Sequence, residues 1–188
     1  MRADFDIAFK RMSPWEWRKG KEYTNHPKDK GGPTKYGITE KVARKEGYEG
    51  YMKDLPLDFA KIIYKKKYWN NWRLGEIVCQ EIADQLFQAA VNQGVPLWKK
   101  YLQRTCNMLS IYDVGTIAVD GVIGPITINA LNTIILNHGY IALSHVIYVK
   151  QDDRYDKIVE RSPSQKWARK GWKNRTKAFL ITTKNGRG

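Results

Sequence analysis

The sequence predicts a mainly α-helical fold of the α+β class: a helical bundle with a small β-hairpin or loop lobe near the N-terminus. Apolar residues recur at helical spacing along most of the 188-residue chain, which is 42% hydrophobic and 12% aromatic. Residues 20–38 interrupt this pattern, because glycine, proline, asparagine and aspartate replace apolar residues there. We therefore expect a packed helical core with one irregular insertion, and we exclude a disordered chain.

The first helix is expected over residues 4–12. Four apolar residues share one face of this helix: Phe5, Ala8, Phe9 and Met12. Pro14 should end the helix, because proline has no N–H for the helical ladder. In the insertion that follows, Gly31–Gly32 is the expected hairpin turn, and Thr39 is the expected cap of a short helix.

Further helical patterns cover much of the remaining chain. Apolar stripes occupy 58–72, 81–95, 96–109 and 118–132. Gly94 and Pro96 should separate the second of these from the third, and Gly124–Pro125 should begin the helical part of the fourth. At 161–175, Ser162 and Gln165 have the spacing of a capping box, which predicts a final helix.

The charge of the chain predicts an anionic partner. Thirty-three basic residues against 19 acidic ones give a formal net charge of +14. Nucleic acid, an anionic membrane surface or a bacterial wall would attract such a protein. Cys79 and Cys106 fit buried apolar positions, and the three histidines lack metal-binding spacing, so no metal and no cofactor is expected. No apolar run is long enough for a transmembrane helix, and no secretory signal is seen.

Two carboxylates are candidates for chemistry. Glu16 lies between Trp15 and Trp17, and apolar neighbours favour a protonated acid. Asp29 precedes Gly31–Gly32, and Thr34 follows with Tyr36 on a segment expected to be extended. Composition alone favours an ordinary surface acid at Glu16, and an ordinary turn accounts for Asp29, so residue chemistry by itself leaves the catalytic alternative open.

A longer motif resembles a known family. The string Y-x-N-x-P-x-D-x-G-G-x-T-x-x-G-I-T, which begins at Tyr23, is similar to the signature of glycoside hydrolase family 108, the phage-type lysozymes. The segments FDIAFKRMSPWE, AAVNQG and VDGVIGPITINALN resemble further parts of that family in the same order. The family usually writes its catalytic glutamate in an E-G-G-Y string, which this chain lacks. Counting from Phe5 places Glu16 at that position, with Glu22 as the alternative acid.

The resemblance implies a lysozyme-like cleft between the helices and the small lobe. Glu16 would be the general acid, and Asp29 with Thr34 would stabilise charge or hold water. The resemblance also implies a group of substrate-binding residues: Tyr23, Asn25, Tyr36, Trp69 and Asn92. It implies a catalytic region at 1–95 and a peptidoglycan-binding region at 96–188, packed as one compact monomeric unit.

The expected function is therefore that of an N-acetylmuramidase, a bacteriolytic lysozyme or phage endolysin acting on anionic peptidoglycan. Such an enzyme would be made in a host cytoplasm and released to the wall. The alternatives are a non-catalytic wall-binding or secretion-assisting protein on the same fold, and a basic nucleic-acid-binding protein. The last has no recognised nucleic-acid motif in the sequence, so no specific nucleic acid is expected as a partner.

Overall fold

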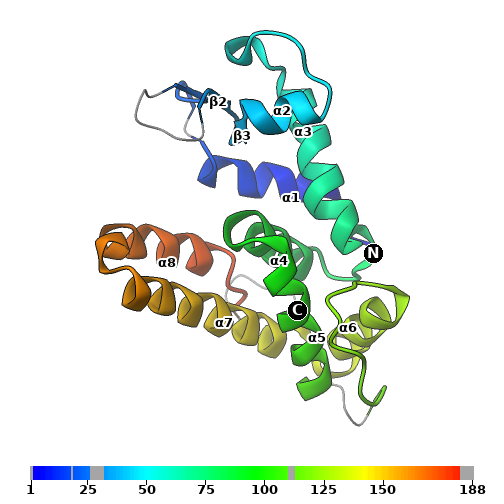
Figure 1. Ribbon diagram of the computed structural model, residues 1–188. Coiled ribbons are helices and arrows are strands. Elements are labelled where there is room, and N and C mark those ends of the chain that lie inside the picture. The colour runs from blue at the N-terminus through cyan, green and yellow to red at the C-terminus, as the bar shows by residue number, and fades with distance from the viewer. Residues whose placement is uncertain (1, 18, 26–31, 110–112, 183–188) are drawn as a thin grey trace.

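The computed structural model describes residues 2–17, 19–25, 32–109 and 113–182. This part of the chain holds eight α-helices and one three-stranded antiparallel sheet, which confirms the predicted mainly α-helical class. The sheet, α2 and α3 form one end of the molecule, with α1 beneath them (Figure 1). Helix α4 lies at the centre, and α5 to α8 form the other end (Figure 1). Among the described residues, no helix has the length and apolar character needed to cross a bilayer.

Helix α1 (Phe5–Met12) buries the predicted apolar stripe against α4. Asp4 caps its first turn, accepting a hydrogen bond from the Ile7 N–H at 2.9 Å. As predicted, the helix ends before Pro14, where the chain tightens into a 3-10 turn (Ser13–Trp15). Glu16 is the next residue, so the end of α1 determines where its side chain lies.

The small sheet consists of β1 (Tyr23–Thr24), β2 (Thr34–Lys35) and β3 (Ile38–Thr39) in that order. Strand β1 pairs with β2. The predicted Gly31–Gly32 turn lies between these strands in the sequence, and Gly31 is outside the described residues. A second, tight turn joins β2 to β3.

That second turn was not predicted. Its two residues, Tyr36 and Gly37, have φ values of 51° and 73°. Two successive positive φ values are typical of a type I′ hairpin turn. The expectation that Tyr36 continues an extended segment with Thr34 is therefore wrong, because the backbone reverses at Tyr36.

Helices α2 (Glu40–Lys45) and α3 (Leu57–Tyr64) follow the sheet, with a 3-10 turn (Met52–Asp54) between them. The helical pattern predicted for 58–72 is confirmed only to Tyr64. Beyond it the chain widens into a π-helical turn (Lys65–Trp69) and then tightens into two 3-10 turns (Asn70–Trp72 and Leu74–Glu76). Trp69 and Trp72 point into the core from these turns.

Helix α4 (Gln80–Gln93) is the centre of the fold, and its residues 82–90 are all buried. It ends at Gly94 as predicted, and α5 (Val95–Leu109) follows. Helix α4 packs against α1 on one side and against α5 and α7 on the other. Buried amides join α4 to α7: Gln85 donates to the Ser144 carbonyl at 3.1 Å, and Gln93 donates to the Gln151 carbonyl at 3.2 Å.

Three helices complete the chain: α6 (Pro125–His138), α7 (Tyr140–Arg161) and α8 (Arg169–Ala178). Gly124 and Pro125 begin α6 as predicted. The predicted capping box at Ser162 is wrong, because its side chain makes no capping bond. The Gln165 N–H donates to the Ser162 backbone carbonyl instead, at 2.9 Å, and a 3-10 helix (Pro163–Ala168) leads into α8. Helix α8 packs along α7 and returns the chain to the end of α1 (Figure 1).

Candidate active site

Glu16 lies in a cavity of about 630 Å³ between the end of α1 and helix α8. The lining combines aromatic, cationic and amide side chains from the N-terminal turn, α4 and α8. The lining residues are Pro14, Trp15, Glu16, Trp17, Lys21, Asn92, Gly171, Trp172 and Arg175. A concave site with aromatic walls and a few convergent polar groups is typical of a ligand-binding site.

The position of Glu16 is fixed from both ends of the residue. Its backbone N–H donates to the Ser13 carbonyl at 3.0 Å and so closes the 3-10 turn. Its side chain, 17% exposed, forms an ion pair with Arg175 in which Oε1 and Nη2 are 2.5 Å apart. The Arg175 side chain is 7% exposed. This charge-assisted contact is shielded from water and therefore orients the Glu16 carboxylate strongly.

An aromatic layer supports the turn that carries Glu16. The Trp17 ring packs edge-on against Tyr36, with 5.2 Å between centroids, and against Phe9 at 6.0 Å. Tyr64 lies behind this layer, and its hydroxyl donates to the Tyr36 carbonyl at 3.1 Å. The hairpin turn, the end of α1 and helix α3 are thus held together beside Glu16.

Gly37 brings the hairpin close to Glu16. A Cβ atom built at Gly37 would lie 2.5 Å from the Tyr64 hydroxyl and 3.6 Å from Glu16 Oε2. Only glycine fits this position, because its φ is positive and no space exists for a side chain. The Tyr36–Gly37 turn therefore brings the backbone close to the candidate acid.

Two tyrosine hydroxyls near Glu16 remain protonated. Burial, and secondarily the negative charge of Glu16, raises the pKa of Tyr64 far above its ordinary value. The same two causes raise the pKa of Tyr68. Both side chains are therefore neutral hydroxyls at physiological pH and are poor candidates for the proton-transferring group.

Asn92 and Trp172 form one wall of the cavity and are held by the same residue, Tyr155. The Tyr155 hydroxyl donates to Asn92 Oδ1 at 2.6 Å, and the Tyr155 ring stacks on Trp172 with 5.2 Å between centroids. Tyr155 is buried on α7, so it fixes one residue from α4 and one from α8 in the same wall.

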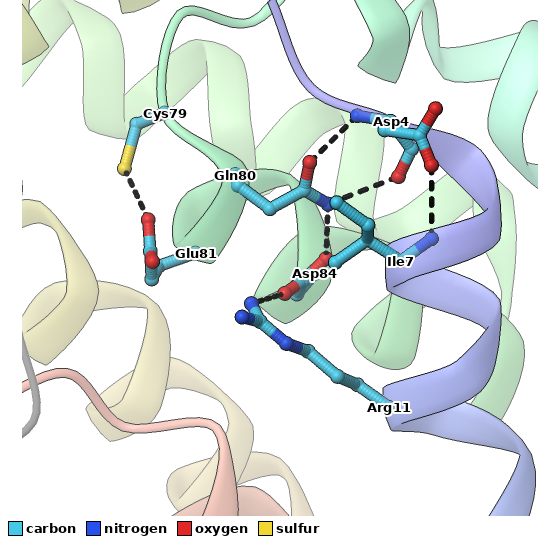
Figure 2. Close-up of polar contacts among 7 residues, drawn as sticks. All are labelled: Asp4, Ile7, Arg11, Cys79, Gln80, Glu81 and Asp84. Carbon is cyan, nitrogen blue, oxygen red and sulfur yellow. Dashed lines mark hydrogen bonds and ion pairs between the residues drawn. The ribbon is translucent and has the colours of Figure 1, made fainter.

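A polar network attaches α1 to α4 and so places the Glu16 turn (Figure 2). Gln80 accepts from the Asp4 N–H at 2.6 Å and donates to Asp84 Oδ1 at 2.7 Å, and Arg11 pairs with Asp84 Oδ2. Asp84 is 3% exposed, and burial raises the pKa of its carboxyl despite these partners. A second cavity of about 320 Å³ lies beside this network and shares Trp15 with the Glu16 cavity.

Comparison with known families assigns both halves of the chain. Residues 15–94 match the model of glycosyl hydrolase 108, and residues 99–177 match that of a predicted peptidoglycan domain. The chain thus carries a glycosyl hydrolase 108 region followed by a predicted peptidoglycan domain. It is therefore a peptidoglycan-related glycoside hydrolase.

The fold is shared with a solved structure. Brucella abortus SagA is 24% identical and superposes with a TM-score of 0.57, covering 96% of this chain and 97% of that chain. No curated protein sequence matches the chain. The hydrolase 108 region contributes Trp15, Glu16 and Asn92 to the cavity, and the peptidoglycan domain contributes Trp172 and Arg175.

The structure places the predicted acids in different settings. Glu16 lies in the cavity, whereas Glu22 bonds locally and accepts from the Gly20 N–H at 2.7 Å. Backbone hydrogen bonds, first that of Gly20, lower the pKa of Glu22. Asp29 lies outside the described residues. Thr34 is half-buried on β2, and its hydroxyl donates to the Gly32 carbonyl at 3.1 Å.

The predicted substrate-binding residues also separate. Asn92 lies in the cavity wall, and Tyr36 stands behind Trp17. Tyr23 and Asn25 are exposed on or beside β1, outside the described residues that line the cavity. Trp69 is 4% exposed and packs on Phe5 and Phe87, and its role in substrate binding stays a prediction. Its flat ring is used in the core.

Sequence reasoning missed Arg175 and Lys21 as residues of the cavity. Arg175 is one of many basic residues between 161 and 177, and nothing in their pattern distinguishes the buried one. Trp172 and Thr176 are four residues apart on α8, and the Thr176 hydroxyl donates to the Trp172 carbonyl. The aromatic side chain of Trp172 is the local signal in the sequence that this face of the helix turns inward. Among the described residues, no group of three or more histidine, cysteine or acidic side chains could hold a metal ion.

Proposed function

We propose that the protein is an N-acetylmuramidase of the lysozyme type, which cleaves the bond between N-acetylmuramic acid and N-acetylglucosamine in peptidoglycan. One observation carries this proposal: the Glu16 carboxyl lies in an aromatic-walled cavity large enough for sugar rings, at the junction of the hydrolase 108 region and the peptidoglycan domain. Aromatic faces and convergent polar groups suit carbohydrate, whose rings have apolar faces and hydroxyl edges.

Glu16 is the proposed general acid. The glycosidic oxygen is a poor leaving group, so it must receive a proton as the bond to the sugar breaks. The neighbouring Tyr64 and Tyr68 hold their protons too tightly for this role. Glu22 accepts a hydrogen bond from the Gly20 N–H, which lowers the pKa of its carboxyl, and it is not among the described residues that line the cavity. These properties support Glu16 over the other groups nearby.

The positive charge that develops on the sugar needs an anion or an activated water on its other side. Asp29 and Thr34 remain the proposed residues for this role, as the family resemblance implies. The Thr34 hydroxyl donates its hydrogen to the Gly32 carbonyl at 3.1 Å. Its oxygen is still able to accept a hydrogen bond from a water molecule while that bond is kept.

The ion pair with Arg175 sets a condition on the mechanism. In this structure Oε1 of Glu16 is held by the Arg175 guanidinium, whereas a general acid must present its carboxyl to the glycosidic oxygen. Glu16 must therefore loosen its contact with Arg175 when substrate binds. The same ion pair favours the second candidate function, a non-catalytic wall-binding protein on this fold, if the contact persists in the complex.

The substitution Glu16→Gln separates the two functions. It keeps the size of the side chain and removes the proton donor, so release of dye from labelled peptidoglycan should fall at least about a hundredfold. Glu22→Gln is the matched control and should digest the wall at close to the wild-type rate. Circular dichroism must show that both variants fold. Wild-type activity in Glu16→Gln would exclude Glu16 as the acid, and an inactive wild-type protein that binds wall would support the second function.

A further inference from the structure

Arg175 has binding capacity that the free protein does not use. The residue is 6% exposed and lines the Glu16 cavity, and its Nη2 atom pairs with Glu16. Its Nε atom is buried without a hydrogen-bond partner among the described residues. A buried donor without an acceptor costs free energy, so the guanidinium would gain from a second acceptor inside the cavity.

The rest of the cavity is also prepared for an anion. Lys21 lines it, and Glu16 is the single acidic residue among the described lining residues. The negative charge of Glu16 is already matched by Arg175, so Lys21 leaves an excess of positive charge. Trp15 and Trp172 provide apolar walls on which the body of a sugar ring can rest.

We propose that Arg175 binds a carboxylate of the substrate, so that the peptidoglycan domain supplies a carboxylate subsite next to the candidate acid. This inference rests on the proposed function, because it takes a wall glycan to be the occupant of the cavity. N-acetylmuramic acid carries a lactyl carboxyl, whereas N-acetylglucosamine has no acidic group. A guanidinium distinguishes the two sugars through paired, charge-assisted hydrogen bonds.

Partner exchange then links substrate binding to the acid. When Arg175 turns toward the substrate carboxylate, Glu16 loses its ion-pair partner and Oε1 is released. The Glu16 carboxyl can then turn to the glycosidic oxygen, to which the proposed general acid gives its proton. Glu16 and the substrate carboxylate thus compete for one guanidinium, and removal of the Glu16 charge should strengthen binding of the acidic glycan.

The test compares two glycans on variants that cannot cleave them. The ligands are a peptide-free wall oligosaccharide with its lactyl carboxyl and the same oligosaccharide with that carboxyl reduced to an alcohol. Titration calorimetry on Glu16→Gln should give a Kd for the acidic glycan that is about tenfold lower than the Kd for the reduced glycan. Adding Arg175→Gln should bring the ratio of the two Kd values close to one. Adding Arg169→Gln, on the same helix but paired with Asp156 at 2.5 Å, should leave the ratio unchanged.

An E16Q/R175Q protein that keeps the tenfold ratio would overturn the inference. If E16Q/R175Q does not fold, Arg175→Lys is combined with Glu16→Gln instead. A smaller preference for the acidic glycan than in Glu16→Gln alone supports the subsite, and an equal preference contradicts it. A peptide-bearing oligosaccharide, in which the lactyl carboxyl is an amide, identifies the source of the carboxylate. Arg175 dependence with this ligand alone would assign the subsite to the peptide. A failure of the proposed function would be seen separately, because Glu16→Gln would then still digest the wall.

Discussion

Glu16 and Arg175 form an ion pair of 2.5 Å although 159 residues separate them in the chain. The contact joins the turn after α1 to helix α8, and so it joins the glycosyl hydrolase 108 region to the peptidoglycan domain. The C-terminal domain is therefore part of the candidate active site. Through Arg175 it also fixes Glu16, the proposed general acid.

The ion pair should contribute to stability as a coupled unit. Arg175→Gln leaves the Glu16 carboxylate shielded from water without its partner, so we expect a loss of about 2 kcal/mol in the free energy of unfolding. The double variant Glu16→Gln/Arg175→Gln should lose less than the sum of the single changes. Urea unfolding of all four proteins measures this coupling. Strictly additive losses would mean that the two side chains do not interact in solution.

Gly37 should tolerate no side chain. Gly37→Ala would strain a backbone with φ of 73° and would place Cβ 2.5 Å from the Tyr64 hydroxyl. We expect a loss of about 2–3 kcal/mol and a decrease in wall digestion, because the turn beside Glu16 must shift. Gly32→Ala is the matched control: φ is 68° there, but nothing lies within 4 Å of the new atom. Equal thermal melting of the two variants would contradict the close approach.

Tyr155 should act through the position of Asn92. Tyr155→Phe removes the hydroxyl that donates to Asn92 Oδ1 at 2.6 Å and keeps the ring that stacks on Trp172. We expect a loss of about 1 kcal/mol in stability and a severalfold higher KM for soluble wall glycan, with kcat little changed. Tyr101→Phe, whose ring packs on Trp98 away from the cavity, serves as the control. A KM unaffected by Tyr155→Phe would remove Asn92 from the substrate-binding wall.

Asp84 should make stability depend on pH in an identifiable direction. Burial raises the pKa of Asp84 above the ordinary 3.8, so the folded protein binds this proton more tightly than the unfolded chain. The contribution is fully present below pH 3.8 and is lost as pH rises through the higher folded value. The stability of the wild type relative to Asp84→Asn should therefore decrease with rising pH. An increase, measured by urea unfolding across this range, would show that the Arg11 pair outweighs burial.

Local patterns predicted the elements that frame the site. The four-residue stripe of α1 is buried, Pro14 ends that helix, and Gly94 ends α4, because each depends on neighbours in the chain. Glu16 was identified for the same reason: its flanking tryptophans and the family motif are both local. The resemblance to family 108 supplied the function, which helical spacing alone does not contain.

Features that depend on distant segments were not predictable. Arg175 lies in a strongly basic stretch, where any residue reads as a solvated charge, and its burial depends on how α8 meets α1. Trp69 reads the same whether it faces a sugar or the core, and the wide turn at Lys65–Trp69 directs it inward. Tyr36 adopts a positive φ because Gly37 follows it and Tyr64 holds its carbonyl, and the second of these contacts is not visible in the sequence.

Mass analysis of digested peptidoglycan tests the central claim most directly. Fragments released by the wild type should end in N-acetylmuramic acid at the reducing end, which borohydride converts to the sugar alcohol before detection. Glu16→Gln should release none of them under the same conditions. Fragments that end in N-acetylglucosamine, fragments cut within the peptide, or the same muramic acid ends from Glu16→Gln would each contradict a muramidase that uses Glu16 as its acid.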